Sequence, residues 1–171
     1  MFVEATKLLN LPVASEESMS KIGEISEIIV DPDNGTISGF LVKLPGIFGP
    51  QKVLSVVDVL AWDPNGIVTS DQENLVDKNE IVRIQRILNQ NFHLIGLRAE
   101  TESKKHLGQI EDFLIDTETQ TVAKYYLRNI LGNSLILGND KVVKIDKKII
   151  FTDDCGEIES DTGMETNAQT I

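Results

Sequence analysis

Acidic residues and a glycine follow one another closely in the segment Asp31–Gly35, an arrangement that could coordinate a calcium ion. An EF-hand loop, however, needs glycine at its sixth position and glutamate at its twelfth. A loop that begins at Asp31 would have Thr36 and Val42 there. Aspartate, proline, asparagine and glycine at this spacing favour a tight turn instead. We therefore predict no metal site in this segment.

Histidine, cysteine and paired carboxylates are the other residues that could act in catalysis or bind a metal. His93 and His106 are the only two histidines, and neither has a cysteine or a second histidine at ligand spacing. Cys155 is the single cysteine, so it cannot form an internal disulfide. Neighbouring carboxylates such as Glu16 and Glu17 point to opposite sides of a strand, which fits a solvated face better than an acid–base pair. We predict no catalytic residue, no cofactor and no metal, and hence a protein that is not an enzyme.

Length, charge and hydropathy narrow the function classes further. The chain has 171 residues, of which 41% are apolar, and no apolar run approaches the about 20 residues that span a bilayer. Its formal net charge of −11 at pH 7 opposes long-range attraction to nucleic acid, which clustered lysine and arginine would provide. The first residues lack the basic stretch and apolar core of a secretory signal. We therefore expect a cytoplasmic protein without a transmembrane segment that does not bind nucleic acid directly.

The pattern of apolar and turn residues occurs twice in the chain. Segment 9–42 aligns with segment 94–127 without a gap. Identical residues include Leu9 and Leu94, Ala14 and Ala99, Gly23 and Gly108, Ile25 and Ile110, and Asp31 and Asp116. Such a repeat indicates two copies of one small module. Few of the repeated side chains could act in catalysis or bind a metal, so the repeat gives information about the fold rather than about an active site.

Each copy contains a predicted β-hairpin. In the first copy, runs rich in β-branched residues at 22–30 and 36–42 flank the turn, where Gly35 tolerates a positive φ. The turn of the second copy, at 116–120, has lost proline and glycine, so we expect a looser loop there. Further strands are predicted at 52–59, 61–62 and 67–70, and in the second copy at 135–137, 141–145 and 149–152. Short strands separated by turns indicate an all-β barrel or sandwich.

The chain therefore divides into two modules, a helix and a tail. We assign residues 1–76 to a first barrel, 77–90 to a short amphipathic linking helix, 91–154 to a second barrel and 155–171 to a disordered acidic tail. Asp77 and Glu80 have the spacing of a capping box, and Ile81, Ile84 and Ile87 mark one apolar face. The tail is too polar to offset the entropy of ordering.

These features resemble the PRC-barrel family. The resemblance is carried by Gly23, the apolar triplet that ends in Asp31, the strand Ile37–Val42 and the run Val53–Val59. The family includes the cytoplasmic part of the photosynthetic reaction centre H subunit and the C-terminal half of a bacterial ribosome-maturation factor. The resemblance covers both copies, although Val53–Val59 has no close counterpart around Lys141–Ile145. It implies two tandem small β-barrels that act as an interaction module without catalytic residues or a cofactor.

Five residues in the two copies are expected to have structural roles. Gly23 and Gly108 belong where a strand bends or another backbone approaches closely. Asp31 and Asp116 can accept hydrogen bonds from the turn amides that follow them, and Gly35 supplies the turn with its positive φ.

The apolar loop 44–50 is the main candidate for contact with a partner. Ile47 and Phe48 lie there between glycines and prolines, and Ile130 and Leu131 occupy the matching place in the second copy. Exposed apolar loop tips often dock on a partner or touch a lipid surface. The alternative is that Ile47 and Phe48 fold back and fill the mouth of the barrel.

The sequence thus favours an adaptor or scaffold that acts through protein contacts. The ribosome-maturation factor suggests one alternative, an assembly factor for an RNA–protein machine. The H subunit suggests another, a peripheral component of a membrane or photosynthetic complex. The partner and the oligomeric state stay open.

Overall fold

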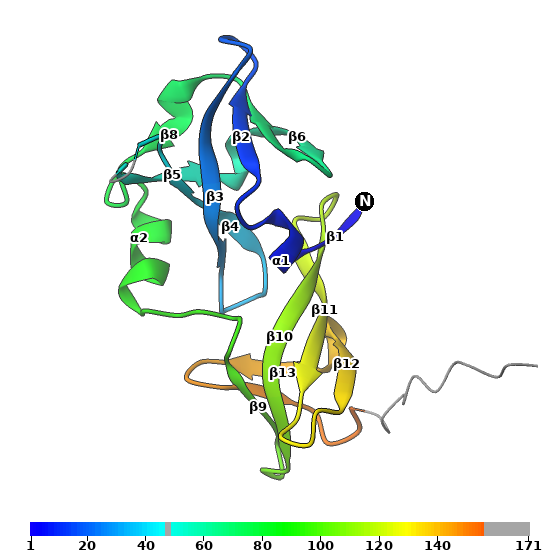
Figure 1. Cartoon of the computed structure of the whole chain (residues 1–171). Coiled ribbons are helices and arrows are strands. Elements are labelled where there is room, and N and C mark those ends of the chain that lie inside the picture. The colour runs from blue at the N-terminus through cyan, green and yellow to red at the C-terminus, as the bar shows by residue number, and fades with distance from the viewer. Residues whose placement is uncertain (47–48, 156–171) are drawn as a thin grey trace, which may run out of the picture.

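The computed structural model describes residues 1–46 and 49–155, which form two curled β-sheets of seven strands each (Figure 1). The first sheet contains β2 (Pro12–Ser15), β3 (Ser20–Val30), β4 (Ile37–Lys43), β5 (Gln51–Ser55), β6 (Val59–Asp63), β7 (Gly66–Thr69) and β8 (Leu75–Val76). The second contains β1 (Phe2–Glu4), β9 (Arg98–Thr101), β10 (His106–Asp116), β11 (Thr121–Arg128), β12 (Ser134–Gly138), β13 (Val142–Ile145) and β14 (Ile149–Phe151). We call residues 12–76 the first module and residues 98–151 the second module.

Helices are few and short. The α-helices are α1 (Ala5–Leu8) and α2 (Val82–Asn89), and the 3-10 helices are η1 (Val56–Asp58), η2 (Gln72–Asn74) and η3 (Asn139–Lys141). Helix α2 lies in the chain between the two modules, and α1 separates β1 from β2. The protein is therefore mostly β, as the sequence predicted.

The two sheets have the same order of strand pairing. In the first sheet the order is β6-β7-β2-β3-β4-β5, with β8 added beyond β5, and in the second it is β13-β14-β9-β10-β11-β12. The pairs β2–β7 and β9–β14 are parallel. Bulges also recur, between Ile25 and Glu27 in β3 and between Ile110 and Asp112 in β10. Because a bulge bends a strand and increases its local twist, matching bulges give both sheets a similar curl.

Each curled sheet keeps two edges. Among the described residues no ladder joins β6 to β8, or β13 to β12, so hydrogen bonding does not close either sheet into a complete cylinder. The chain instead passes from β5 to β6 through η1, and from β12 to β13 through η3. These 3-10 turns carry the chain across the gap where the sequence led us to expect a closed barrel.

One continuous core fills the two sheets and the space between them. Its largest side chains include Phe40 in the first module and Tyr125 in the second, both fully buried. Phe40 meets the ring of Trp62 edge to face, and Tyr125 meets Phe151 in the same way, with centroids 5.4 and 5.7 Å apart. Edge-to-face contacts of this kind add to the stabilisation that burial provides. The two modules therefore share a hydrophobic interior.

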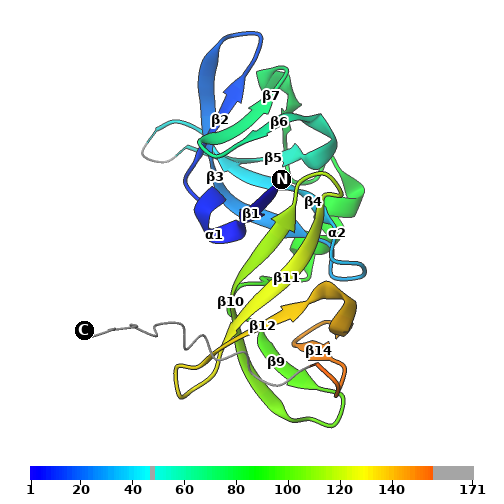
Figure 2. The same cartoon turned by 90° about the vertical axis from the view of Figure 1, so that its right-hand side faces the viewer.

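The N-terminal strand joins the second sheet. β1 pairs antiparallel with β10, so that Phe2 lies opposite Asp116 (Figure 2). β9 pairs only with residues 106–109 of β10, which leaves the far end of this long strand for another partner. The predicted first barrel of residues 1–76 thus includes a short strand that pairs with the other sheet. Residues 2–4 complete the other module, and α1 then returns the chain to β2.

Helix α2 covers the outer face of the first sheet (Figure 1). Ile84 and Ile87 are buried against Ile29, Leu41 and Val53, which come from three neighbouring strands. The apolar face that the sequence predicted is the face that the helix buries. The burial of two isoleucine side chains stabilises this contact by about 3–6 kcal/mol relative to their exposure.

The helix begins later than the sequence indicated. Residues 77–80 form a turn before α2, in which the Glu80 carboxylate accepts a hydrogen bond from the Asp77 N–H at 2.8 Å. The Asp77 carboxylate, however, binds the Lys52 ammonium at 2.7 Å rather than a backbone amide of its own segment. Half of the capping box is therefore present, and the helix starts at Val82.

Removal of the Ile84 side chain tests the cover that α2 provides. We expect Ile84→Ala to lower the free energy of unfolding by about 2–5 kcal/mol, because it leaves a cavity under the helix. Val82→Ala is the matched control, since Val82 is exposed on the same helix and its truncation should cost less than about 0.5 kcal/mol. Urea unfolding followed by the fluorescence of Trp62, the single tryptophan, measures both. Equal effects of the two substitutions would contradict the packing.

Candidate functional site at the junction of the two modules

The turns of the β3–β4 and β10–β11 hairpins meet tip to tip. Thr36 and Thr121, which hold equivalent places in the two copies, form an antiparallel bridge. The N–H of the residue after each threonine donates to the carbonyl of the residue before the other, at 2.8 and 2.9 Å. Each bond is the counterpart of the other, because the donor and the acceptor come from equivalent positions in opposite modules. The contact therefore has the local symmetry of a two-fold interface. This contact joins the two sheets.

Gly35 lies at the point of closest approach between the turns. Its φ is +70°, and a Cβ atom there would lie 3.2 Å from Asn139 Oδ1 and 3.5 Å from the Tyr125 hydroxyl oxygen. The Tyr125 hydroxyl donates to Asn139 Oδ1 at 2.9 Å. Burial raises the pKa of Tyr125, because the interior disfavours the phenolate. The first module's turn therefore lies directly on the aromatic core of the second.

Asp31 ties the same turn to α2. Its side chain is only 4% exposed. One carboxylate oxygen accepts the Asp33 N–H at 2.9 Å, and the other accepts two N–H groups of Arg83 at 2.9 and 3.1 Å. Arg83 also donates to the Thr36 hydroxyl at 3.1 Å. A charge-assisted pair with a buried carboxylate holds its geometry more firmly than an exposed pair, so hairpin and helix are fixed to each other.

The second hairpin turn is held in a related way but by a different neighbour. The Asp116 carboxylate accepts the Glu118 N–H at 3.0 Å, and the Thr117 N–H donates to the Met1 carbonyl at 2.9 Å. The N-terminal segment thus flanks this turn where α2 flanks the first. Gln120 stands in the place of Gly35 and also adopts a positive φ, of +55°.

Gly23 and Gly108 stand where another backbone or side chain comes close. A Cβ atom on Gly108, whose φ is +124°, would overlap the Arg128 carbonyl oxygen. One on Gly23 would overlap the Val42 side chain. Each glycine also adjoins a bulge at the same place in β3 and β10. These contacts are structural, and neither glycine borders a group that could react.

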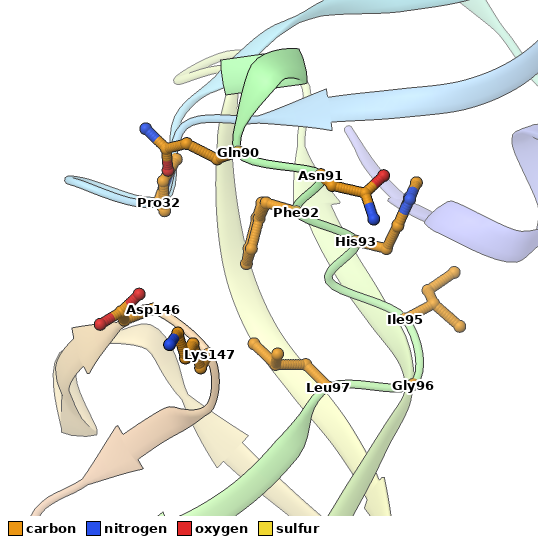
Figure 3. A pocket seen from close by; sticks show the side chains of 10 residues that line it. All are labelled: Pro32, Gln90, Asn91, Phe92, His93, Ile95, Gly96, Leu97, Asp146 and Lys147. Atoms are coloured by element: carbon orange, nitrogen blue, oxygen red, sulfur yellow. The ribbon is translucent and has the colours of Figure 1, made fainter. Parts of the chain in front are cut away.

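A cleft of about 650 Å³ lies beside the junction (Figure 3). Phe92 and Leu97, from the segment that follows α2, point into it. Pro32 of the first hairpin turn lines one wall, and Asp146 and Lys147 of the β13–β14 turn line the opposite wall. The cleft therefore has an apolar floor, takes its walls from both modules and carries one charge of each sign at its rim.

His93 holds the connecting segment against the first sheet. Its Nδ1 atom lies 2.7 Å from the Glu27 carboxylate on β3, a contact that the sequence did not reveal. Figure 3 places His93 on the side of the segment away from Phe92. The nearby Ser26 hydroxyl donates to the Leu41 carbonyl rather than to the histidine, so no nucleophile–base pair forms here. The contact positions the floor of the cleft.

Two of the four predicted partner-contact residues lie within the part of the chain that the structure describes. Ile130 and Leu131 are 91% and 80% exposed at the tip of the β11–β12 loop. Asn129 Oδ1 shapes this tip, because it accepts the N–H groups of Leu131 and Asn133 at 2.9 Å each. Ile47 and Phe48 lie outside the described residues. The exposed tip lies on the second module and does not line the cleft.

Titratable side chains are scattered rather than gathered at one site. Within residues 1–46 and 49–155, no three histidine, cysteine, aspartate or glutamate side chains are placed to hold a metal ion. Cys155, assigned to the tail by the sequence, is instead buried with the core, and burial raises the pKa of its thiol. The remaining residues assigned to the tail, 156–171, lie outside the described residues.

The first module thus combines a defined order of strands, bulges in β3 and a buried Asp31 turn. Residues 1–75 match the family model of the PRC-barrel domain. The first module is a PRC-barrel domain. PRC-barrel domains are small β-barrel modules that often bind other proteins. A comparison with curated proteins found no match. Within residues 1–46 and 49–155, no helix is long and apolar enough to cross a membrane.

Asp31 and Asp33 offer a matched test of how the junction is held. We expect Asp31→Asn to lower the free energy of unfolding by roughly 1–3 kcal/mol, because it removes the charge that Arg83 binds at a buried position. Asp33→Asn should cost less than about 0.5 kcal/mol, since Asp33 and Arg86 form their 3.1 Å pair in solvent. Urea unfolding measures both variants, and a larger loss for Asp33→Asn would contradict the assignment.

Proposed function

We propose that this chain is a non-enzymatic protein-interaction adaptor built from two PRC-type modules. The second module lies beyond the matched residues 1–75. Its assignment to the same fold is supported by the repeated pairing order, by the repeated bulges in β3 and β10, and by the parallel pair that each sheet contains. Helix α2 then acts as the link between two tandem PRC barrels.

The cleft beside the junction is the proposed binding site, and its fixed walls are the observation that carries the proposal. Pro32 belongs to a turn held by the Asp31–Arg83 pair, and Phe92 precedes the residue held by Glu27. A site whose walls are already in place loses little entropy on binding. Its volume of about 650 Å³ falls within the range of about 300–1,000 Å³ that is common for ligand pockets.

The partner that fits this cleft is a protein segment rather than a small metabolite. The cleft is open along one side, and its apolar floor is formed by Phe92 and Leu97. An apolar side chain of the partner would pack on Phe92 while its backbone passes between the two turns. Lys147 and Asp146 at the rim can pair with polar groups that flank that side chain. The described residues that line the cleft include no nucleophile beside a base, which agrees with a binding role.

The two alternatives from the sequence use other surfaces or other partners. An assembly factor for an RNA–protein machine would bind a protein component, because the net charge of −11 opposes direct contact with RNA. A peripheral role at a membrane would use the exposed tip formed by Ile130 and Leu131. Co-sedimentation with ribosomal subunits tests the first alternative, and flotation with lipid vesicles tests the second. A cytoplasmic location stays a prediction.

Phe92→Asp tests the cleft. We expect affinity capture from cells that express the chain, with quantification of the captured proteins, to lose one specific partner by about tenfold or more, because a carboxylate on the floor cannot pack against an apolar side chain. Val82→Asp is the control, since Val82 is exposed outside the cleft, and it should retain that partner. Thermal unfolding checks that both variants fold. The same captured proteins in equal amounts from the wild type and both variants would contradict the site.

A further inference from the structure

One edge of the second sheet lacks the cover that its counterpart has. In the first module β5 pairs with β4 on one side and with β8 on the other, where Val53 lies opposite Val76. β12 holds the place of β5 in the second module, because it pairs with β11 as β5 pairs with β4. Across the part of the chain that the structure describes, β12 has no partner on its other side.

Ile136 shows the consequence of the missing cover. It lies opposite Tyr126 in the ladder of β12 and β11, as Val53 lies opposite Leu41 in the ladder of β5 and β4. Val53 is completely buried under β8 and α2, whereas Ile136 is 52% exposed. Edge strands are normally protected by charged residues, proline or bulges. The five residues of β12, Ser-Leu-Ile-Leu-Gly, contain neither a charge nor a proline.

The backbone of Ile136 also faces the bare edge. Just before β12, the Asn129 N–H donates to the Asn133 carbonyl at 3.0 Å. Hydrogen-bonded pairs recur at every second residue of an antiparallel ladder, so Leu135 and Leu137 bond to β11. The N–H and C=O groups of Ile136 then point away from β11. In the first module the equivalent groups of Val53 face β8.

We propose that this edge is a self-association surface, at which β12 of one copy pairs antiparallel with β12 of a second copy. The proposal concerns a different surface from the cleft and does not depend on the adaptor role. With a two-fold axis at Ile136, this residue faces its own symmetry mate and Ser134 faces Gly138. The outward backbone groups of both strands are then satisfied, and the two isoleucine side chains contact each other.

The sequence of the edge favours a second copy over an unrelated strand. The pairing is self-complementary, because no charged residue of β12 meets a like charge in this register. The exposed tip of Ile130 and Leu131 directly precedes β12, so it would lie beside η3 of the second copy and extend the apolar contact. β-strand addition of this kind derives affinity from main-chain bonds and specificity from the side chains between them.

The charges near the edge permit this contact. Lys124 and Arg128 lie on β11 opposite Gly138 and Ser134. Because strands lie about 4.8 Å apart, Lys124 and the partner's Arg128 would be about 14 Å apart, three strand spacings. This distance exceeds the Debye length of about 8 Å at physiological ionic strength. The net charge of −11 on each copy gives a weak overall repulsion, so salt should strengthen the association.

Sedimentation equilibrium of the full chain, from about 1 to 200 µM protein at two salt concentrations, tests the proposal. We expect a monomer–dimer equilibrium that tightens as salt rises. Ile136→Lys should weaken the dimer by about tenfold or more, because it places a charge beside its own symmetry mate. Val143→Lys is the matched control, since Val143 is 49% exposed on β13 at the opposite edge of the same sheet. It should leave the dissociation constant within about twofold of the wild type.

Hydrogen exchange of the wild-type chain provides a readout that does not depend on a variant. The Ile136 amide should exchange about tenfold more slowly at the highest protein concentration than at the lowest, while the Val143 amide stays unchanged. A chain that is monomeric at every concentration would overturn the proposal, and the edge would then be open to a strand of another protein. A dimer that Ile136→Lys leaves intact, or in which the Ile136 amide gains no protection, would overturn it equally.

Discussion

The contact between the two hairpin turns fixes the relation between the modules, and the cleft depends on it. Two backbone hydrogen bonds around Thr36 and Thr121 contribute only about 1–3 kcal/mol together. They form where Gly35 lies against Tyr125 and Asn139, so closely that a Cβ atom at Gly35 would be only 3.2 Å from Asn139 Oδ1. The shared core adds the larger stabilisation, since burial of a single leucine such as Leu8 in α1 contributes about 1.5–3 kcal/mol. The bonds specify the geometry and the core maintains it.

The two sheets share one order of strand pairing but have different surroundings. The first module carries β8 on one edge and α2 over its outer face, whereas the second receives β1 beside β10 and leaves β12 bare. The Asp31 turn is tied to a helix, and the Asp116 turn is flanked by the chain's own N-terminal strand. The two similar sheets therefore form one body with two distinct surfaces, a cleft between the modules and a strand edge on the second.

Local sequence patterns predicted the parts of the fold that depend on residues close together in the chain, namely strands, turns and the apolar face of a helix. The alternation around Gly23 and Gly108, the turn after Asp31 and the apolar face of Ile84 and Ile87 are all found in the structure. The later strands of the second module were also predicted, but no counterpart of Val53–Val59 was found around Lys141–Ile145, because the loop before β12 is shorter than the loop before β5. The true counterpart of Val53 is Ile136. The difference in loop length hides this equivalence in a gapless alignment of the sequence, but the pairing of β12 with β11 and of β5 with β4 shows it.

The features that form the cleft depend on contacts between residues far apart in the chain. Nothing near Phe2 indicates that it will pair with β10, and nothing near Glu27 indicates that it will bind His93. Likewise, Gln120 is not a residue that favours a positive φ, yet it adopts one in the turn where its carbonyl accepts the Ile37 N–H. The sequence therefore predicted two modules but not their junction, and the candidate site lies at the junction.

The most direct test of the shared body is native-state hydrogen exchange of the wild type and Gly35→Val under increasing denaturant. If the modules form one body, core amides of β3–β4 and β10–β11 will exchange through one global opening with the same free energy. Gly35→Val, which adds a branched side chain at a φ of +70° against the second module, will lower that free energy equally in both hairpins. Different opening free energies in the two wild-type hairpins, or a loss confined to the first hairpin in Gly35→Val, would contradict the account.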